Sequence, residues 1–462
     1  MGASSPAGHS SSGSSQSSLP LLAKRLLTFA LYALVPLALL HCLLNQQHLP
    51  RLPDLITAAT SSFSPTPPPP PPEPEPEAPP NVAAAAPAAC DYSDGEWVRT
   101  AEGPRYNGTS CAGTIRDGQN CMAHGRPDTG YLHWRWRPRR CALPPFDPAA
   151  FLDLLRGRHV VFAGDSLARN QCESLVCMLA SAFPAEPVRD GGAGAGGWED
   201  GRRPRRWEFP SHGARVSVFW SPFLVNGKER SGEPGDEHHR LYLEQPDERW
   251  AAELPVADVV VLAAGHWFSH QALYYDAGGA VVGCHFCPDP NMTDTGFFGA
   301  FRLAIRNTLR EVVARAGGGG GRPKLAVVTT FPPAHFEGDW DSPRACARTE
   351  PYSPEERPEE GGMDVEMWRA GAEEAAAAAA GAEAAARGVT VEALQVTRLA
   401  GLRPDGHPGV YMKASPFAGG VPERVRNDCL HWCLPGPIDT WNEILLQILR
   451  RWAHASSTSA AP

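Results

Sequence analysis

Two short strings, far apart in the chain, contain the three side chains that acyl transfer through a serine ester requires. Gly164-Asp165-Ser166 directly follows the apolar run of residues 159–163, and Asp428 and His431 stand three residues apart near the C-terminus. A serine needs an adjacent base to become a nucleophile, and the base needs a carboxylate to hold its tautomer. Ser166, His431 and Asp428 are therefore a candidate catalytic set.

Each string also has a plainer structural explanation. Ser166 stands where a helix is expected to begin, and a serine at that place can simply cap the helix. His431 can be a surface histidine on a loop pinned by Cys429 and Cys433. Taken alone, a Gly-Asp-Ser string favours the cap, because so short a motif often occurs by chance. The combination of the two strings favours chemistry.

The elements that must position these residues are those of an α/β domain. In an open α/β sheet, sites form beyond the carboxyl ends of the strands, and a helix N-terminus there can stabilise an oxyanion. Short β-branched runs bounded by Gly and Pro alternate with helical lengths, which predicts a mostly parallel sheet flanked by helices. We expect strands over 159–163, 215–220, 258–264, 325–331 and 389–396, and helices over 167–180, 365–387 and 438–452. We expect 192–197, 226–238 and 317–321 to be exposed insertions or loops.

The segments before residue 90 and after residue 453 are not expected to join this domain. Residues 1–25 predict a disordered cytosolic tail, and residues 26–44, without acidic or basic residues, predict a transmembrane signal anchor. Lys24 and Arg25 precede this run, which places the N-terminus in the cytosol and the rest in a lumen. A cleaved signal peptide and a buried helix are the alternatives. Residues 45–89 predict a Pro-rich luminal stalk, and residues 454–462 a disordered tail.

The cysteines and the charge narrow the class of protein further. The chain has 12 cysteines, and all but Cys42 lie beyond the predicted anchor, which is typical of a disulfide framework in an oxidising compartment. Cys284 and Cys287 have zinc-site spacing, but no second pair accompanies them, so we expect a local disulfide and no metal. Sequons at Asn107 and Asn291 agree with secretion. The net charge of −9 offers no basis for nucleic-acid binding.

Four ordered motifs resemble the trichome birefringence-like proteins of plants, which are Golgi polysaccharide O-acetyltransferases with a GDSL/SGNH-like (PC-esterase) domain. The resemblance rests on residues 90–98 (CDYSDGEWV), 164–171 (GDSLARNQ), 265–268 (GHWF) and 428–437 (DCLHWCLPGP). It covers nearly the whole folded region. It implies an SGNH-like α/β fold with a disulfide-rich N-terminal subdomain at 90–143 and a catalytic domain at 144–453.

The resemblance also implies roles for individual residues. Ser166, His431 and Asp428 are the implied triad, and Arg169, Asn170 and Gly265 are the candidates for the oxyanion hole. His266 and Trp267 are implied substrate-binding residues. Because Ala263 and Ala264 stand where relatives often carry a polar residue, the group that completes the oxyanion hole is open. The implied disulfides are Cys90–Cys141, Cys111–Cys177, Cys121–Cys433 and Cys346–Cys429, with Cys284–Cys287 additional and Cys172 free.

The expected function is O-acetylation of a plant hemicellulose by double displacement at Ser166. The motifs are most similar to the xyloglucan branch, with mannan and then xylan as the next expected acceptors. No bound cofactor is expected, and the acetyl donor is acetyl-CoA or an acetylated carrier. The expected partners are the acceptor polysaccharide, the Golgi membrane through one helix, and a membrane protein that supplies the donor.

The candidate platforms for stacking on sugar rings are Trp267, Phe268, Trp340 and Trp432, although a tryptophan more often lies in the core. The alternatives are an acetylesterase and a non-catalytic wall-polymer binding protein.

Overall fold

The computed structural model describes residues 90–458 except 189–202, 317–321, 323, 354 and 357–361. The predicted tail, membrane anchor and stalk of residues 1–89 lie outside the described residues, as do the loops at 192–197 and 317–321. Within the described part of the chain, no helix is both long enough and apolar enough to cross a bilayer.

The core of the domain is a seven-stranded sheet in the order β13-β12-β9-β3-β6-β5-β4. The strands from β13 to β6 are parallel, and β5 and β4 continue the sheet antiparallel. β3, β9 and β12 are buried along their whole length, which explains their unbroken apolar sequences. The predicted mostly parallel sheet is confirmed. Its strands are β3 (His159–Gly164), β4 (Glu186–Pro187), β5 (Arg205–Phe209), β6 (Ala214–Trp220), β9 (Val259–Ala263), β12 (Lys324–Thr329) and β13 (Val389–Leu394).

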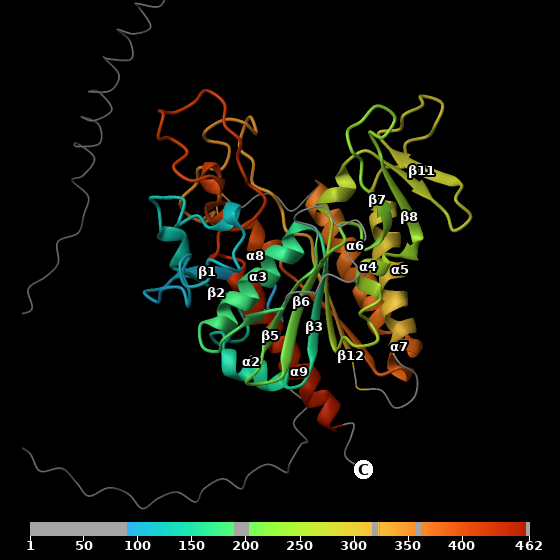
Figure 1. Ribbon diagram of the computed structural model, residues 1–462, viewed down its shortest axis with the longest axis horizontal. Helices are drawn as coiled ribbons and strands as arrows, with labels where there is room; N and C mark the ends of the chain where they lie inside the picture. The colour runs from blue at the N-terminus through green and yellow to red at the C-terminus, as the bar shows by residue number, and fades with distance from the viewer. Residues whose placement is uncertain are drawn as a thin grey trace, which may run out of the picture. The chain divides into compact units, whose positions relative to one another are not determined.

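Helices cover both faces of this sheet (Figure 1). Alternate residues of β3 serve the two sides: Val160 and Phe162 pack with α2, α3 and α9, while Val161 and Ala163 pack with α5 and α6. This period of two is the pleat of a strand buried on both faces. The helices are α2 (Pro148–Leu154), α3 (Ser166–Ala180), α4 (Glu248–Ala251), α5 (Phe298–Arg315), α6 (Gly362–Ala379), α7 (Ala382–Ala386), α8 (Thr397–Gly401) and α9 (Asp439–Thr458).

Two helix boundaries differ from the sequence-based expectation. The single helix expected over 365–387 is broken into α6 and α7, and Gly381 caps the second piece. A glycine inside a helix costs about 1 kcal/mol relative to alanine, which favours a break there. The C-terminal helix continues to Thr458, so the predicted disordered tail at 454–462 begins too early. Residues such as Ala453 and Ala455 favour helix and extend it.

A second, four-stranded sheet in the order β11-β10-β8-β7 was not predicted. The sequence predicts an insertion over 226–238, but β7 (Val225–Lys228) already occupies its start and β8 (His239–Pro246) follows it. β10 (Ala272–Tyr275) and β11 (Val281–His285) complete the sheet. These strands alternate buried and partly exposed residues, so they lack the continuous apolar runs that identify the central strands.

The N-terminal subdomain (residues 90–143) is built on a hairpin of β1 (Gly95–Arg99) and β2 (Trp134–Pro138). Cys90–Cys141 closes the subdomain on itself, Cys111–Cys177 joins it to α3, and Cys121–Cys433 joins it to the second sequence string. The predicted disulfide-rich subdomain is therefore present. The 3-10 turns are η2 (Asp117–Gln119), η3 (Gly130–Leu132), η4 (His266–Ser269), η5 (Pro404–Gly406) and η6 (Val410–Met412).

The turn from β3 into α3 requires a glycine at residue 164. Gly164 has a φ of +152°, and a Cβ at this position would lie 1.7 Å from the carbonyl oxygen of Ala263. The same carbonyl accepts the backbone N–H of Asp165 at 3.0 Å, so β9 cannot move away without breaking that bond. The close approach of two parallel strands therefore fixes the position of Ser166.

We expect Gly164→Ala to destabilise the fold by roughly 3 kcal/mol or more, because the methyl group overlaps backbone that cannot yield. The matched control is Gly299→Ala in the first turn of α5, where a Cβ meets nothing within 4 Å. That variant should be neutral or gain about 0.5–1 kcal/mol. Urea unfolding measures both. Equal stability of the two variants would contradict the assignment of this turn.

Candidate active site

Asp428 holds His431 through both its ring and its backbone. Nδ1 of His431 lies 2.8 Å from Oδ2 and 3.0 Å from Oδ1 of Asp428. Oδ1 also accepts the backbone N–H groups of His431 at 2.9 Å and Leu430 at 3.2 Å. Because an ionised carboxylate only accepts hydrogen bonds, Nδ1 carries a proton, and in the neutral ring Nε2 carries the lone pair. This is the tautomer that a general base needs.

The electrostatics of Asp428 agree with this arrangement. Burial acts to raise the pKa of its carboxyl group. The charge of His431, the hydrogen bond from its ring and the two backbone N–H groups outweigh burial and lower the pKa to about 2. Asp428 is therefore ionised at neutral pH.

The other ring nitrogen of His431, Nε2, is not engaged by the surrounding structure: it is buried and has no hydrogen-bond partner among the described residues. The charge of His431 acts on Asp165 and on His266, so the imidazole lies beside the turn after β3 and the turn after β9. An unpaired, buried nitrogen at this place is available to take a proton from a hydroxyl.

Asn170 brings the first turn of α3 against the residue that follows His431. Its Oδ1 accepts the backbone N–H of Trp432 at 2.8 Å, and its Nδ2 donates to the carbonyl of Trp432 at 3.2 Å. Ser166 and Asn170 are four residues apart on one helix, so they share a face. The buried amide of Asn170 thus positions the main chain beside His431 through both its oxygen and its nitrogen.

The cap of α3 is Asp165 and not Ser166. Asp165 Oδ1 accepts the backbone N–H of Leu167 at 2.9 Å, and Ser166 is the first helical residue. The plainer explanation of Ser166 as a helix cap is therefore wrong, and its hydroxyl is free of that task. An aspartate directly before a helix is a strong capping signal, so the sequence contained this information.

Asp165 is also an electrostatically unusual residue. Its carboxyl group is 2% exposed, and its Oδ2 has no partner among the described residues. Burial raises its pKa to about 6, although the N–H of Leu167 and the charge of His431 act in the opposite direction. A second negative charge can therefore form next to the serine near neutral pH.

Two disulfides fasten the catalytic loop (residues 428–433) on either side of His431. Cys429 is bonded to Cys346, 83 residues away, and Cys433 is bonded to Cys121, 312 residues away. With Cys90–Cys141 and Cys111–Cys177, these are the four pairs that the resemblance implies, and the additional local pair Cys284–Cys287 is also formed. Cys172 is buried and unpaired.

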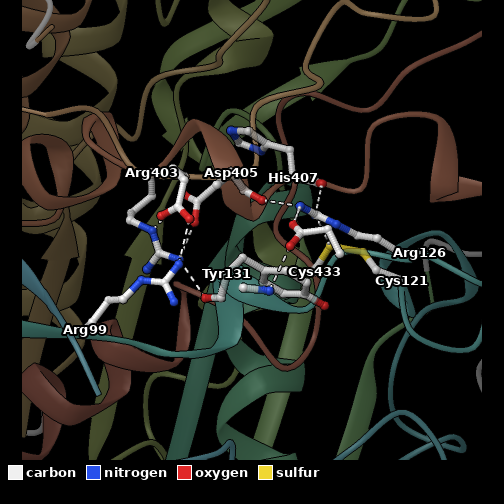
Figure 2. A network of polar contacts seen from close by, with 11 residues as sticks. Arg99, Cys121, Arg126, Tyr131, Arg403, Asp405, His407 and Cys433 are labelled. Carbon is white, nitrogen blue, oxygen red and sulfur yellow. Dashed lines mark hydrogen bonds and ion pairs between the residues drawn. A yellow bond between two sulfur atoms is a disulfide. The ribbon is translucent and has the colours of Figure 1, made fainter. Parts of the chain in front are cut away.

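Figure 2 shows a polar network that joins the N-terminal subdomain to the segment behind the catalytic loop. The Arg126 guanidinium donates to the backbone carbonyls of Asp405 at 2.6 Å and His407 at 2.7 Å, and it stacks on the ring of Tyr131. Arg403 forms a buried, two-point ion pair with Asp405 and donates to the carbonyl of Tyr131. Sequence patterns did not identify Arg126 or Arg403, because their partners lie far away along the chain.

The remaining predicted site residues lie around the turn after β9. A Cβ on Gly265 would lie 2.5 Å from the ring of Phe331, so this glycine is required by packing. His266 donates from Nε2 to the carbonyl of Pro332 at 2.9 Å, and burial lowers its pKa to about 4, so it is neutral. Arg169 stacks over Trp220 at 5.4 Å, and burial lowers its pKa to about 10.

The four predicted aromatic platforms differ in their exposure to solvent. Trp432 and Phe268 are fully buried and cannot stack on a sugar, which corrects the expectation for both. Trp340 is 63% exposed, and Trp267 is partly exposed. Trp267 contacts Trp220 edge-on at 5.3 Å and also His239 and His270. The sequence analysis missed this cluster, because its members come from three separate segments.

The described residues contain no group of three or more His, Cys, Asp or Glu side chains suited to a metal ion. Both predicted sequons are accessible, since Asn107 and Asn291 are exposed.

Comparisons with known proteins find two families along the chain. Residues 143–448 match PC-Esterase, described as the GDSL/SGNH-like acyl-esterase family found in Pmr5 and Cas1p, and residues 88–142 match the PMR5 N-terminal domain. A relative from Populus trichocarpa, "Xyloglucan O-acetyltransferase 1", is 48% identical over 94% of this chain and 95% of its own length. "Xyloglucan O-acetyltransferase 2" of the same species is 53% identical over 80% of this chain and 84% of its own length. The Arabidopsis thaliana protein "Xyloglucan O-acetyltransferase 1" is 51% identical over 79% of this chain and 81% of its own length.

Asp165→Asn should stabilise the protein at pH 7.5 but not at pH 4. The folded-state pKa of Asp165, about 6, lies above its ordinary value of 3.8. The stability that Asp165 contributes to the fold is therefore fully present below pH 3.8 and is lost as the pH rises through about 6. Asparagine keeps the cap without the charge, so the gain at pH 7.5 is up to about 3 kcal/mol. Urea unfolding at both pH values measures the change in stability.

Asp428→Asn is the opposed control and should lose stability at pH 7.5, because the pKa of Asp428 is lowered in the folded state. An Asp165→Asn gain that does not depend on pH would contradict the assignment.

Removing the disulfide beside His431 should impair chemistry more than removing the local one. We expect Cys346→Ala with Cys429→Ala to lower the turnover of p-nitrophenyl acetate by about 10²-fold, because small displacements of a catalytic group are costly. Cys284→Ala with Cys287→Ala is the matched control and should keep turnover within about twofold, since it closes only a three-residue separation. Similar losses in both double variants would refute a positioning role for Cys346–Cys429.

Proposed function

We propose that this chain, which belongs to the GDSL/SGNH-like acyl-esterase family found in Pmr5 and Cas1p, transfers acetyl groups to hydroxyls of the hemicellulose xyloglucan. One observation carries the proposal: relatives named xyloglucan O-acetyltransferase are 48–53% identical to the chain over about four fifths of its length or more. Such identity over both domains supports a common enzymatic activity. The hydrogen bond between His431 and Asp428 and the place of Ser166 at the start of α3 support the proposed chemistry.

The first half of the proposed reaction forms an acetyl-serine. Nε2 of His431 accepts the hydroxyl proton of Ser166 while Oγ attacks the carbonyl carbon of the acetyl donor. The tetrahedral intermediate then collapses, and the imidazolium of His431 returns the proton to the departing group of the donor. Asp428 stabilises the imidazolium, because its carboxylate is ionised and accepts from Nδ1.

The second half transfers the acetyl group to the sugar. A hydroxyl of the acceptor loses its proton to Nε2 of His431 and attacks the acetyl-serine, and the proton then returns to Oγ of Ser166. Water in place of the sugar would make the same site an acetylesterase. The bound acceptor therefore decides whether the acetyl group is transferred or hydrolysed, so the residues that bind the acceptor are part of the mechanism.

The oxyanion hole is proposed to use backbone N–H groups. The N–H of Leu167 is taken by Asp165, and the amide of Asn170 is taken by Trp432. The N–H groups of Ser166 and Gly265 are the proposed donors, one at the helix N-terminus and one at the adjacent turn. A single such donor typically contributes about 3–4 kcal/mol of transition-state stabilisation.

Trp267 and Trp340 are the proposed platforms for the polysaccharide, since both present indole surface outside the core.

The proposed donor is acetyl-CoA or an acetylated carrier supplied by a membrane partner. The proposed location is the Golgi membrane, with residues 26–44 as the anchor and the catalytic domain in the lumen. Five disulfides and two exposed sequons support an oxidising secretory compartment.

The test is acetyl transfer by the purified protein to xyloglucan, mannan and xylan oligosaccharides. With donor alone, we expect the mass of one acetyl group on Ser166, and with xyloglucan oligosaccharide we expect acetylated sugar. Ser166→Ala should abolish both, a loss of at least about 10⁴-fold, because no other group can carry the ester. Ser269→Ala is a matched control, since among the described residues its hydroxyl donates to the carbonyl of His266. Free acetate without acetylated sugar would identify an esterase, and sugar binding that survives Ser166→Ala without any turnover would identify a binding protein.

A further inference from the structure

Two buried histidines face each other directly behind the catalytic loop. Nδ1 of His335 and Nε2 of His407 lie 2.7 Å apart. The outer nitrogen of each ring is bound to a backbone carbonyl: Nε2 of His335 to Gly401 at 3.0 Å, and Nδ1 of His407 to His431 at 2.7 Å. The two rings thus form a continuous bridge between the two carbonyls.

The number of protons in this bridge follows from its acceptors. A carbonyl oxygen can only accept, so Nε2 of His335 and Nδ1 of His407 must each carry a proton. Two neutral imidazoles supply only two N–H groups, and both are now used. The facing nitrogens would then present two lone pairs to each other at 2.7 Å, which is repulsive. A third proton between the rings turns this contact into a charge-assisted hydrogen bond.

The surroundings of the pair contain both signs of charge. Burial lowers the pKa of both rings, and the charges of His335 and Arg126 lower the pKa of His407 further. Asp405 and Glu337 raise the pKa of His335, and Asp428 raises that of His407. Four further charged or titratable residues lie close to the pair. Arg126 binds the carbonyl of His407, and Tyr352 contacts the ring of His335. Arg403 forms an ion pair with Asp405, and Arg348 forms one with Glu337.

Both histidines contact the catalytic loop. The backbone N–H of His335 donates to the carbonyl of Cys429 at 3.0 Å, while the ring of His407 binds the carbonyl of His431. The ring of His407 also stacks on Trp432, with centroids 4.2 Å apart. Figure 2 shows that His407 lies on the segment whose backbone carbonyls, at Asp405 and His407, accept hydrogen bonds from Arg126. Three residues of the catalytic loop, Cys429, His431 and Trp432, therefore contact this pair.

We infer that His335 and His407 share one extra proton and that this singly charged, bridged pair is a positioning device that fixes the backbone of His431. The role of the loop in catalysis rests on the proposed function, but the proton count does not. When the third proton leaves as the pH rises, one of the three hydrogen bonds must break. The carbonyl of His431 or the segment bound to Cys429 then loses a support, and the catalytic histidine is less well held.

Nitrogen NMR on the full-length protein labelled at histidine tests the proton count directly. We expect N–H signals for three of the four ring nitrogens of the pair at the acid end of the range in which the protein is folded and active. Raising the pH should convert one of them to a bare nitrogen in a single titration. Two N–H groups throughout that range would overturn the inference, whatever the activity of the enzyme.

Two substitutions at one position test the positioning role. In His407→Asn, the amide Nδ2 can still donate to the carbonyl of His431, but no ring nitrogen faces His335. In His407→Ala, both contacts are lost. We expect His407→Ala to lower kcat with p-nitrophenyl acetate by about tenfold with little change in KM, the size of one lost hydrogen bond. His407→Asn should restore most of that loss and should lack the titration of the pair in its pH–rate profile.

The outcomes separate this inference from the proposed function. If His407→Asn keeps the pH–rate profile of the unmodified protein, or if His407→Asn and His407→Ala lose the same activity, the positioning role is refuted. If neither variant folds, the NMR proton count on the unmodified protein decides. If the protein transfers no acetyl group to sugars but hydrolyses p-nitrophenyl acetate, the proposed acceptor fails while the histidine pair is still tested by the same profiles.

Discussion

The site depends on one constraint: the short catalytic loop is bonded at both ends to distant parts of the chain. Cys429 is tied to Cys346, and Cys433 is tied to the N-terminal subdomain through Cys121. Between them, His431 is oriented by Asp428, and the next residue is clamped by Asn170. A histidine on an irregular loop would otherwise wander, and catalytic geometry tolerates little displacement. The covalent ties replace the rigidity that a helix or strand would provide.

The serine is positioned by a different principle. Gly164 lets β3 pass close to β9, and Asp165 caps α3, so the hydroxyl of Ser166 is not needed as the cap. The rigid parallel sheet therefore places Ser166, the proposed nucleophile, while disulfides and polar contacts place His431, the proposed base. The two halves meet at the first turn of α3, where Asn170 grips the main chain beside His431. The N-terminal subdomain takes part in this arrangement through Arg126 as well as through Cys121.

Much of this could be predicted from sequence, and the exceptions have physical reasons. β3, β9 and β12 are buried on both faces, so their apolar runs identify them, whereas β7 and β8 are half-exposed and escaped notice. The serine and histidine stood in recognisable strings. The roles of Asn170, Arg126 and the His335–His407 pair depend on partners 262, 281 and 72 residues away. No periodicity encodes such contacts, and Trp432 was a candidate platform only because it lies next to His431 in the sequence.

The bond between Cys121 and Cys433 has a consequence for the biosynthesis of the protein. The N-terminal subdomain leaves the ribosome first, but the partner of Cys121 lies 312 residues later. While the rest is translated, this thiol must stay reduced or be held in a temporary bond, which an oxidising compartment can provide by exchange. A chain that ends before residue 431 cannot close the bond and lacks the proposed base, His431, as well. Nearly complete synthesis thus precedes any competence for acyl chemistry, so an unfinished chain cannot act on the acetyl esters around it.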